Sequence, residues 1–166
     1  MKQMSGDSYI QKGRVMHEDR SLLTVRLENK EIIRATIAGS FLYKNECRSQ
    51  RPTVGDFVEL TYNPLEGMGR ITKLLERKTQ LARKIAGEFA GEQILGANID
   101  TAFYLSSLNM DLNLRRMERY LIMIKDGGIN PVVLLTKADL VSQEHIKQVL
   151  DAVKRVVKEV PVIVTT

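Results

Sequence analysis

Apolar and polar residues alternate with a period of two along much of the first half of the chain. In the stretch LTVRLENKEIIRATI, Leu23, Val25 and Leu27 alternate with polar residues. The pattern predicts five short strands, over Tyr9–His17, Ser21–Glu28, Glu31–Ile37, Gly55–Tyr62 and Arg70–Leu75. Because the longest gap lies between the third and fourth strands, we predict an OB-type β barrel over residues 1–84, with an SH3-like barrel as the alternative.

The stretch from residue 76 to residue 98 has no sustained period. It holds three glycines and several charged residues. Such a composition is typical of an exposed connection between two domains. We therefore predict a linker or a mobile loop over residues 85–98.

From Ile99 onwards, buried strands alternate with amphipathic helices. The predicted strands cover Ile99–Leu105, Pro131–Leu135 and Val160–Val164, and helical spacing of apolar residues covers Leu114–Lys125 and the segment after Ser142. A β-α-β-α-β order implies parallel strands joined by right-handed crossovers. Residues 99–166 are thus predicted to form the first part of an α/β domain.

The net charge of +5 is distributed unevenly along the chain. Residues 1–84 carry +6 and residues 85–166 carry −1, counted from Lys, Arg, Asp and Glu. A basic excess confined to the predicted barrel suggests a phosphate-rich partner such as RNA, although a merely solvated basic surface is the alternative. The candidate RNA-binding residues are Lys12, Arg14, Arg34, Lys44, Arg48, Arg51, Arg77, Lys78, Arg83 and Lys84.

The chain has few of the Cys and His residues that hold zinc. Cys47 is the only cysteine, and His17 and His145 are the only histidines, so no clustered zinc-ligand spacing occurs. No apolar run approaches the ~18 residues that a membrane span requires. We expect a protein of the cytoplasm with no resident metal in this chain and no membrane partner.

The segment VVLLTKADL contains the clearest candidate chemistry. A buried strand that ends in a Thr-Lys-x-Asp tetrad is the arrangement by which GTPases recognise guanine. The Asp139 carboxylate can accept two hydrogen bonds from guanine, a donor pair that adenine does not offer. The tetrad covers Thr136, Lys137, Ala138 and Asp139, and an ordinary strand end followed by a turn is the alternative interpretation.

A phosphate-binding loop of the form G-x-x-x-x-G-K-[S/T] does not occur in the sequence, and no D-x-x-G segment follows the tetrad. Phosphoryl transfer needs a phosphate cradle, Mg²⁺ ligands and a positioned water. We therefore assign no catalytic residue in this chain.

Several segments resemble the circularly permuted GTPases known as ribosome small-subunit-dependent GTPase A. VGDFVEL at Val54–Leu60 resembles a barrel strand of that family, and the run from Arg77 to Arg83 is similar to its basic exit from the barrel. Ala97–Leu121 resembles its N-x-D strand and following helix, and Ile129–Leu140 is similar to I-x-P-V-x-V-L-N-K-x-D-L. The resemblance runs from about residue 10 to the end of the sequence.

The resemblance carries expectations about the whole protein. It implies an α/β three-layer, P-loop-GTPase-like domain, circularly permuted and truncated here, that uses GTP/GDP and Mg²⁺. It also implies that the phosphate loop, the switch segments and a small zinc-binding domain follow residue 166, so that this fragment alone is inactive. A monomer that acts on the small ribosomal subunit and touches its rRNA through the barrel is the function it implies.

Two positions depart from the family pattern. Thr136 stands where the family has Asn, and Thr165-Thr166 stands where the second guanine-contact motif normally ends in Ser-Ala. Thr165 and Thr166 are therefore added to the candidate nucleotide site. The alternative functions are a non-catalytic RNA-binding module with an α/β scaffold, and an enzyme that uses another nucleotide on the same sheet.

Overall fold

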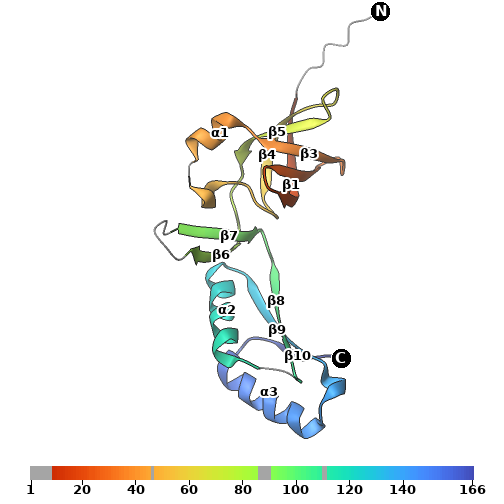
Figure 1. Cartoon of the computed structure of the whole chain (residues 1–166), viewed down its shortest axis with the longest axis vertical. Coiled ribbons are helices and arrows are strands. Elements are labelled where there is room, and N and C mark those ends of the chain that lie inside the picture. Colours follow the sequence, from red (N-terminus) through yellow and green to blue (C-terminus); the bar gives the residue numbers. More distant parts are fainter. Residues whose placement is uncertain (1–8, 46, 86–90, 110–111) are drawn as a thin grey trace, which may run out of the picture. The chain divides into compact units, whose positions relative to one another are not determined.

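The computed structural model describes residues 9–45, 47–85, 91–109 and 112–166. By the clustering of its contacts the chain divides into two compact units, Met1–Asn98 and Ile99–Thr166. The boundary falls after Asn98 because a second, smaller sheet belongs with the barrel. Each unit is described by itself below (Figure 1).

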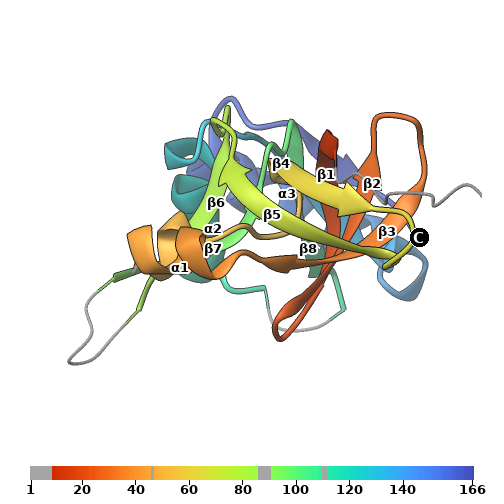
Figure 2. The same cartoon turned by 90° about the horizontal axis from the view of Figure 1, so that it is seen from above.

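The first unit contains a closed barrel of five strands in the order β1-β2-β3-β5-β4. All neighbouring pairs are antiparallel except β3 and β5, which are parallel. This five-stranded Greek-key closure confirms the OB-type prediction (Figure 2). The strands are β1 (Tyr9–Asp19), β2 (Leu22–Leu27), β3 (Ile32–Ile37), β4 (Phe57–Asn63) and β5 (Met68–Leu74).

The barrel interior is filled by alternate residues of each strand. Val25, Val58, Leu60 and Ile71 are fully buried and belong to one continuous core cluster. Their neighbours along each strand point outward, as the period of two requires. Between β3 and β4 the chain forms a short helix, α1 (Gly39–Lys44), and a 3₁₀ turn, η1 (Arg48–Gln50), in a stretch that the sequence pattern had left irregular.

A two-stranded antiparallel sheet follows the barrel. It consists of β6 (Gln80–Ile85) and β7 (Gly91–Ala97). The prediction of a linker or mobile loop over residues 85–98 is therefore wrong for the strand β7, and residues 86–90 lie outside the described residues. The hairpin buries little of either face, so its sequence lacks the alternation that revealed the barrel strands.

The second unit is a parallel sheet of three strands in the order β10-β9-β8. Both helices pack against the same face, where Met117 of α2 and Val153 of α3 share one buried cluster with Val133 and Leu135. The β-α-β-α-β prediction is confirmed. The elements are β8 (Thr101–Ser107), α2 (Leu114–Asp126), β9 (Asn130–Thr136), η2 (Ala138–Leu140), α3 (Gln143–Val157) and β10 (Val162–Val164).

The helices of the second unit begin at capping side chains. Asn113 accepts a hydrogen bond from the Arg116 backbone N–H (2.9 Å), and Ser142 accepts one from the His145 N–H (3.3 Å). Each bond satisfies a backbone donor that the first helical turn leaves unpaired. Among the described residues, no helix is long and apolar enough to cross a membrane.

The other face of this sheet is exposed over much of its apolar surface. Phe103, Leu105 and Ile163 are 56%, 62% and 48% exposed. They alternate with residues that face the helices, as neighbours on a strand must. In the described part of the chain, the sheet therefore has one layer of helices on one side only.

Candidate nucleotide and nucleic-acid sites

The Thr-Lys-Ala-Asp tetrad lies at the carboxyl end of β9, the central strand of the parallel sheet. Thr136 is the last residue of the strand, and Lys137 has a left-handed backbone with φ +63° and ψ +40°. This sharp change of direction leads into η2, which carries Asp139. Ligands of open α/β sheets bind at the carboxyl ends of the strands, so the tetrad has the position that a nucleotide site requires.

Backbone hydrogen bonds join the tetrad to the end of β10. The Thr165 N–H donates to the Leu135 carbonyl (2.8 Å), and the Ala138 N–H donates to the Thr165 carbonyl (3.1 Å). The two segments that the sequence proposed for the base, about 28 residues apart, are thus neighbours in the fold. Lys137, Asp139, Thr165 and Thr166 are all exposed, which leaves their side chains accessible to a ligand.

Thr136 differs from the exposed Lys137 and Asp139 because its side chain bonds to the neighbouring strand. Its hydroxyl donates to the Ser106 carbonyl of β8 at 3.5 Å, and the residue is half-buried. Where the family pattern has Asn, an amide could extend further toward a bound base. The hydroxyl here ties β9 to β8 instead.

Three of the predicted RNA-binding arginines, Arg77, Arg14 and Arg83, have partners inside the first unit. Arg77 donates through Nε and Nη2 to the two carboxylate oxygens of Asp56 (2.8 Å each), and through Nη1 and Nη2 to the carbonyls of Ser49 and Arg51 (2.7 and 2.9 Å). Asp56 is fully buried and the Arg77 side chain is 12% exposed. Four of its five N–H groups are therefore engaged, and we remove Arg77 from the proposed interface.

Arg14 likewise points toward the protein. Its Nε donates to the Gly55 carbonyl (3.2 Å) and its Nη2 to the Asn98 carbonyl (3.0 Å), and its guanidinium carbon lies 5.3 Å from the centre of the Phe57 ring. Arg83 is exposed but donates to Gln93 Oε1 (3.0 Å). The remaining candidates are exposed and distributed over the unit, and they are Lys12, Arg34, Lys44, Arg48, Arg51, Lys78 and Lys84.

These internal contacts form one junction that fastens the β6–β7 hairpin to the barrel. The Ala97 N–H donates to the Val54 carbonyl (3.0 Å), and Asn98 Nδ2 donates to the Gly55 carbonyl (3.1 Å). Gly55 has φ +93°, and a Cβ atom there would lie 2.0 Å from the Ala97 oxygen. Only glycine fits this approach. Gly55 therefore contacts the end of β7, while the adjacent Asp56 binds Arg77.

The barrel exposes two further cations beside Arg34, namely Arg26 and Arg70, that the sequence analysis missed. Arg26, Arg34 and Arg70 occupy outward positions on β2, β3 and β5, and all three are exposed. The strand registers place them near one another, since Thr24 pairs with Arg34, and Thr36 pairs with Arg70. The period of two along each strand was the signal that could have found Arg26 and Arg70.

Solved structures with the same order of elements define the class of the fold. The YjeQ protein of Thermotoga maritima has a TM-score of 0.68 at 22% identity, over 95% of this chain and 52% of that one. YloQ, a circularly permuted GTPase, has a TM-score of 0.67 at 18% identity, over 99% of this chain and 54% of that one. The fold is thus a barrel followed by part of a permuted α/β domain.

Sequence comparison then identifies the family. The profile of the RsgA GTPase family matches residues 74–166. The small ribosomal subunit biogenesis GTPase RsgA of Methanosarcina acetivorans is 36% identical over 151 residues, which cover 91% of this chain and 39% of that protein. RsgA 1 of Listeria monocytogenes is 41% identical over 78% of this chain and 35% of its own length. The chain belongs to the RsgA GTPase family and spans less than half the length of these relatives.

Proposed function

We propose that this chain is the guanine-recognition and RNA-binding part of a GTPase that acts in the maturation of the small ribosomal subunit. The observation that carries the proposal is the hydrogen bonding of the Thr136–Asp139 tetrad to Thr165 at the end of β10. It supports a single base site made from two segments. The names of the relatives supply the assembly on which the whole protein would act.

Guanine recognition follows from the chemistry of the exposed tetrad. The Asp139 carboxylate accepts the N1–H and the exocyclic amine of guanine, while adenine would leave it without a donor pair. The Lys137 stem lies along the flat base, and its ammonium remains in water. The backbone of Thr165 and Thr166 borders the same base.

Hydrolysis belongs to the whole protein in this proposal. The sequence of residues 1–166 has no phosphate-loop motif, and the phosphates supply most of the binding energy of a triphosphate. We propose, on the resemblance to the family, that a phosphate loop, Mg²⁺ ligands and a zinc-binding domain belong to the whole protein. The chain by itself then binds guanine nucleotides weakly and turns none over.

The exposed face of β2, β3 and β5 is the proposed contact with ribosomal RNA. Arg26, Arg34 and Arg70 present guanidinium groups that can bind phosphates, and the charge of +6 over residues 1–84 attracts them. OB barrels bind nucleic acid on the face of their second and third strands. The cytoplasm, a monomeric state and the absence of a membrane partner remain predictions.

The test is the effect of Asp139→Asn on base selectivity. An amide offers a donor where the carboxylate accepted, so the variant should weaken guanine binding and favour xanthine. Nuclear magnetic resonance titration of the ¹⁵N-labelled chain with GDP, ADP and XDP measures this, because weak binding still shifts amide resonances. Wild-type shifts should occur at residues 136–139 and 165–166 with GDP alone.

The matched control is Asp151→Asn, which makes the same chemical change at an exposed position of α3 outside the tetrad. It should bind as the wild type does. Equal shifts with GDP and ADP, or an unaltered preference in Asp139→Asn, would show that the tetrad is only a turn. The chain would then be better described as an RNA-binding module with an α/β scaffold.

A further inference from the structure

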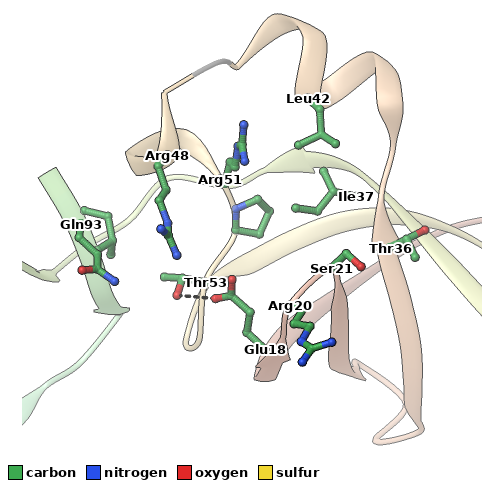
Figure 3. Close-up of a pocket in the computed structure, with 12 residues that line it drawn as sticks. Glu18, Arg20, Ser21, Thr36, Ile37, Leu42, Arg48, Arg51, Thr53 and Gln93 are labelled. Atoms are coloured by element: carbon green, nitrogen blue, oxygen red, sulfur yellow. Dashed lines mark hydrogen bonds between the residues drawn. The ribbon is translucent and has the colours of Figure 1, made fainter. Parts of the chain in front are cut away.

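A cleft of about 380 Å³ lies within the first unit. It is bordered by the turn after β1, the end of β3, the segment from α1 to η1, and β7 (Figure 3). The junction at Gly55 and Asn98 fastens β7 to the barrel, so all walls of the cleft belong to one packed unit.

The walls combine an apolar surface with a few polar groups. Ile37, Leu42, Pro52 and Ile94 are half-buried or buried and supply the apolar part. Small-molecule pockets typically have volumes of roughly 300–1,000 Å³ and this composition. A flat ring of the size of a nucleobase, with its sugar, matches the smaller end of that range.

Three polar side chains of the cleft, Glu18, Thr53 and Gln93, are held in place by hydrogen bonds. The Thr53 hydroxyl donates to Glu18 Oε2 (3.1 Å), the contact drawn in Figure 3. Gln93 accepts from Arg83 Nε through its amide oxygen (3.0 Å). The Glu18 carboxylate is an acceptor with capacity for more than one donor, and the Gln93 amide nitrogen is a donor.

Three arginines surround the cleft. Figure 3 shows Arg48 extending from η1 toward Thr53, Arg51 pointing away from Glu18, and Arg20 beside Glu18 on the turn after β1. The guanidinium groups are therefore spread around the cleft instead of meeting at one point. This spacing suits successive phosphates of a chain better than a single small anion.

We propose that this cleft binds one unstacked nucleotide of single-stranded RNA. The base lies on the apolar wall, and the phosphates on either side contact the arginines. A base with an exocyclic amine is preferred to uracil, because Glu18 accepts from that amine. The inference rests on the proposed binding of RNA by the barrel and names a subsite within it. Sequence-specific recognition of RNA commonly uses bases that are splayed out in this way.

The experiment uses the full chain and single-stranded nine-nucleotide RNAs, one oligo(A) with a central 2-aminopurine and one oligo(U). The fluorescence of 2-aminopurine increases when the base leaves its stack, and fluorescence anisotropy of end-labelled RNA measures affinity separately. The variant Ser21→Leu places a larger side chain in the lining of the cleft, and Ser21 itself is exposed. Glu18→Gln removes the carboxylate while an amide can still accept from Thr53.

With the wild type, 2-aminopurine fluorescence should increase several-fold at saturation, and oligo(A) should bind about ten-fold more tightly than oligo(U). Ser21→Leu should abolish most of the fluorescence increase. Glu18→Gln should reduce the base preference to about two-fold or less. The control Arg34→Gln, on the outer face, should weaken both RNAs equally and leave the fluorescence increase at saturation unchanged.

The outcomes separate the two proposals. If the wild type binds RNA without a fluorescence increase, or if both cleft variants keep the increase, the nucleotide subsite is overturned and RNA binding by the barrel stands. If the wild type binds neither RNA, the subsite and RNA binding by the barrel are both overturned. Circular dichroism spectra that match the wild type establish that the variants are folded.

Discussion

At the scale of single residues, Arg77 illustrates what charge alone cannot predict. Arg77 is a basic residue in the basic half of the chain. That position is as compatible with a contact to phosphate as with an ion pair inside the protein. The structure pairs it with the buried carboxylate of Asp56, which also accepts from the Thr53 N–H (2.8 Å). A buried carboxylate needs such partners, but nothing in the sequence states that Asp56 is buried. The position of the tetrad at the end of β9 was predictable because the apolar run before it indicates a buried strand, and its role in base recognition stays a prediction.

Replacement of Arg77 by Met should therefore destabilise the barrel. The variant leaves Asp56 buried without its cation, which costs about 3–5 kcal/mol. Arg77→Lys should cost less, because the charge remains while the paired hydrogen bonds are lost. Hydrogen exchange of the amides of Val25 and Leu60 in the barrel core measures the effect.

The control is Arg83→Met, since Arg83 is exposed and donates to Gln93 on the neighbouring strand. It should change the free energy of unfolding by less than about 0.5 kcal/mol. If Arg77→Met were equally mild, the Asp56–Arg77 pair would not be a determinant of barrel stability.

At the scale of elements, the period of two was sufficient to predict the barrel because every barrel strand has one buried face. The hairpin of β6 and β7 escaped the same reasoning. Much of β7 is exposed or half-buried, and only Gly96 and Ala97 at its end are buried. Its position depends on the close approach of Ala97 to Gly55, a contact between residues about 42 positions apart. Local patterns cannot predict contacts of that kind.

The outer face of β2, β3 and β5 leads to a prediction about salt. Each phosphate contact contributes about 0.7 to the slope of log affinity against log salt for a single strand. The double variant Arg34→Gln/Arg70→Gln should therefore lower the slope by about 1.4. Anisotropy titrations of a labelled RNA at several salt concentrations measure it.

The matched control is Lys147→Gln/Lys154→Gln, which removes the same charge from α3. Its slope should equal that of the wild type. Equal slopes for both double variants would show that the RNA affinity comes from the overall charge of the chain, with no contribution from a defined face.

At the scale of the whole molecule, the sheets of the two units differ in whether they have unpaired edge strands. The barrel is closed, so each of its five strands pairs on both sides. In the second unit, as described here, β8 and β10 each pair on one side only. Neither strand contains a charged residue, since their sequences are TAFYLSS and VIV.

An unpaired strand edge without charge is a template for another chain, and the exposed Phe103 and Leu105 beside it would add apolar contact between copies. The chain should consequently self-associate through β8 or β10 as its concentration increases, and light scattering should detect the aggregates before the barrel unfolds. Leu105→Lys should delay the onset because a lysine on an edge strand opposes such pairing. Ile32→Lys, at an exposed apolar position of the closed barrel, should leave the onset unchanged. We therefore expect the colloidal behaviour of this chain to depend on its second unit, however stable the first one is.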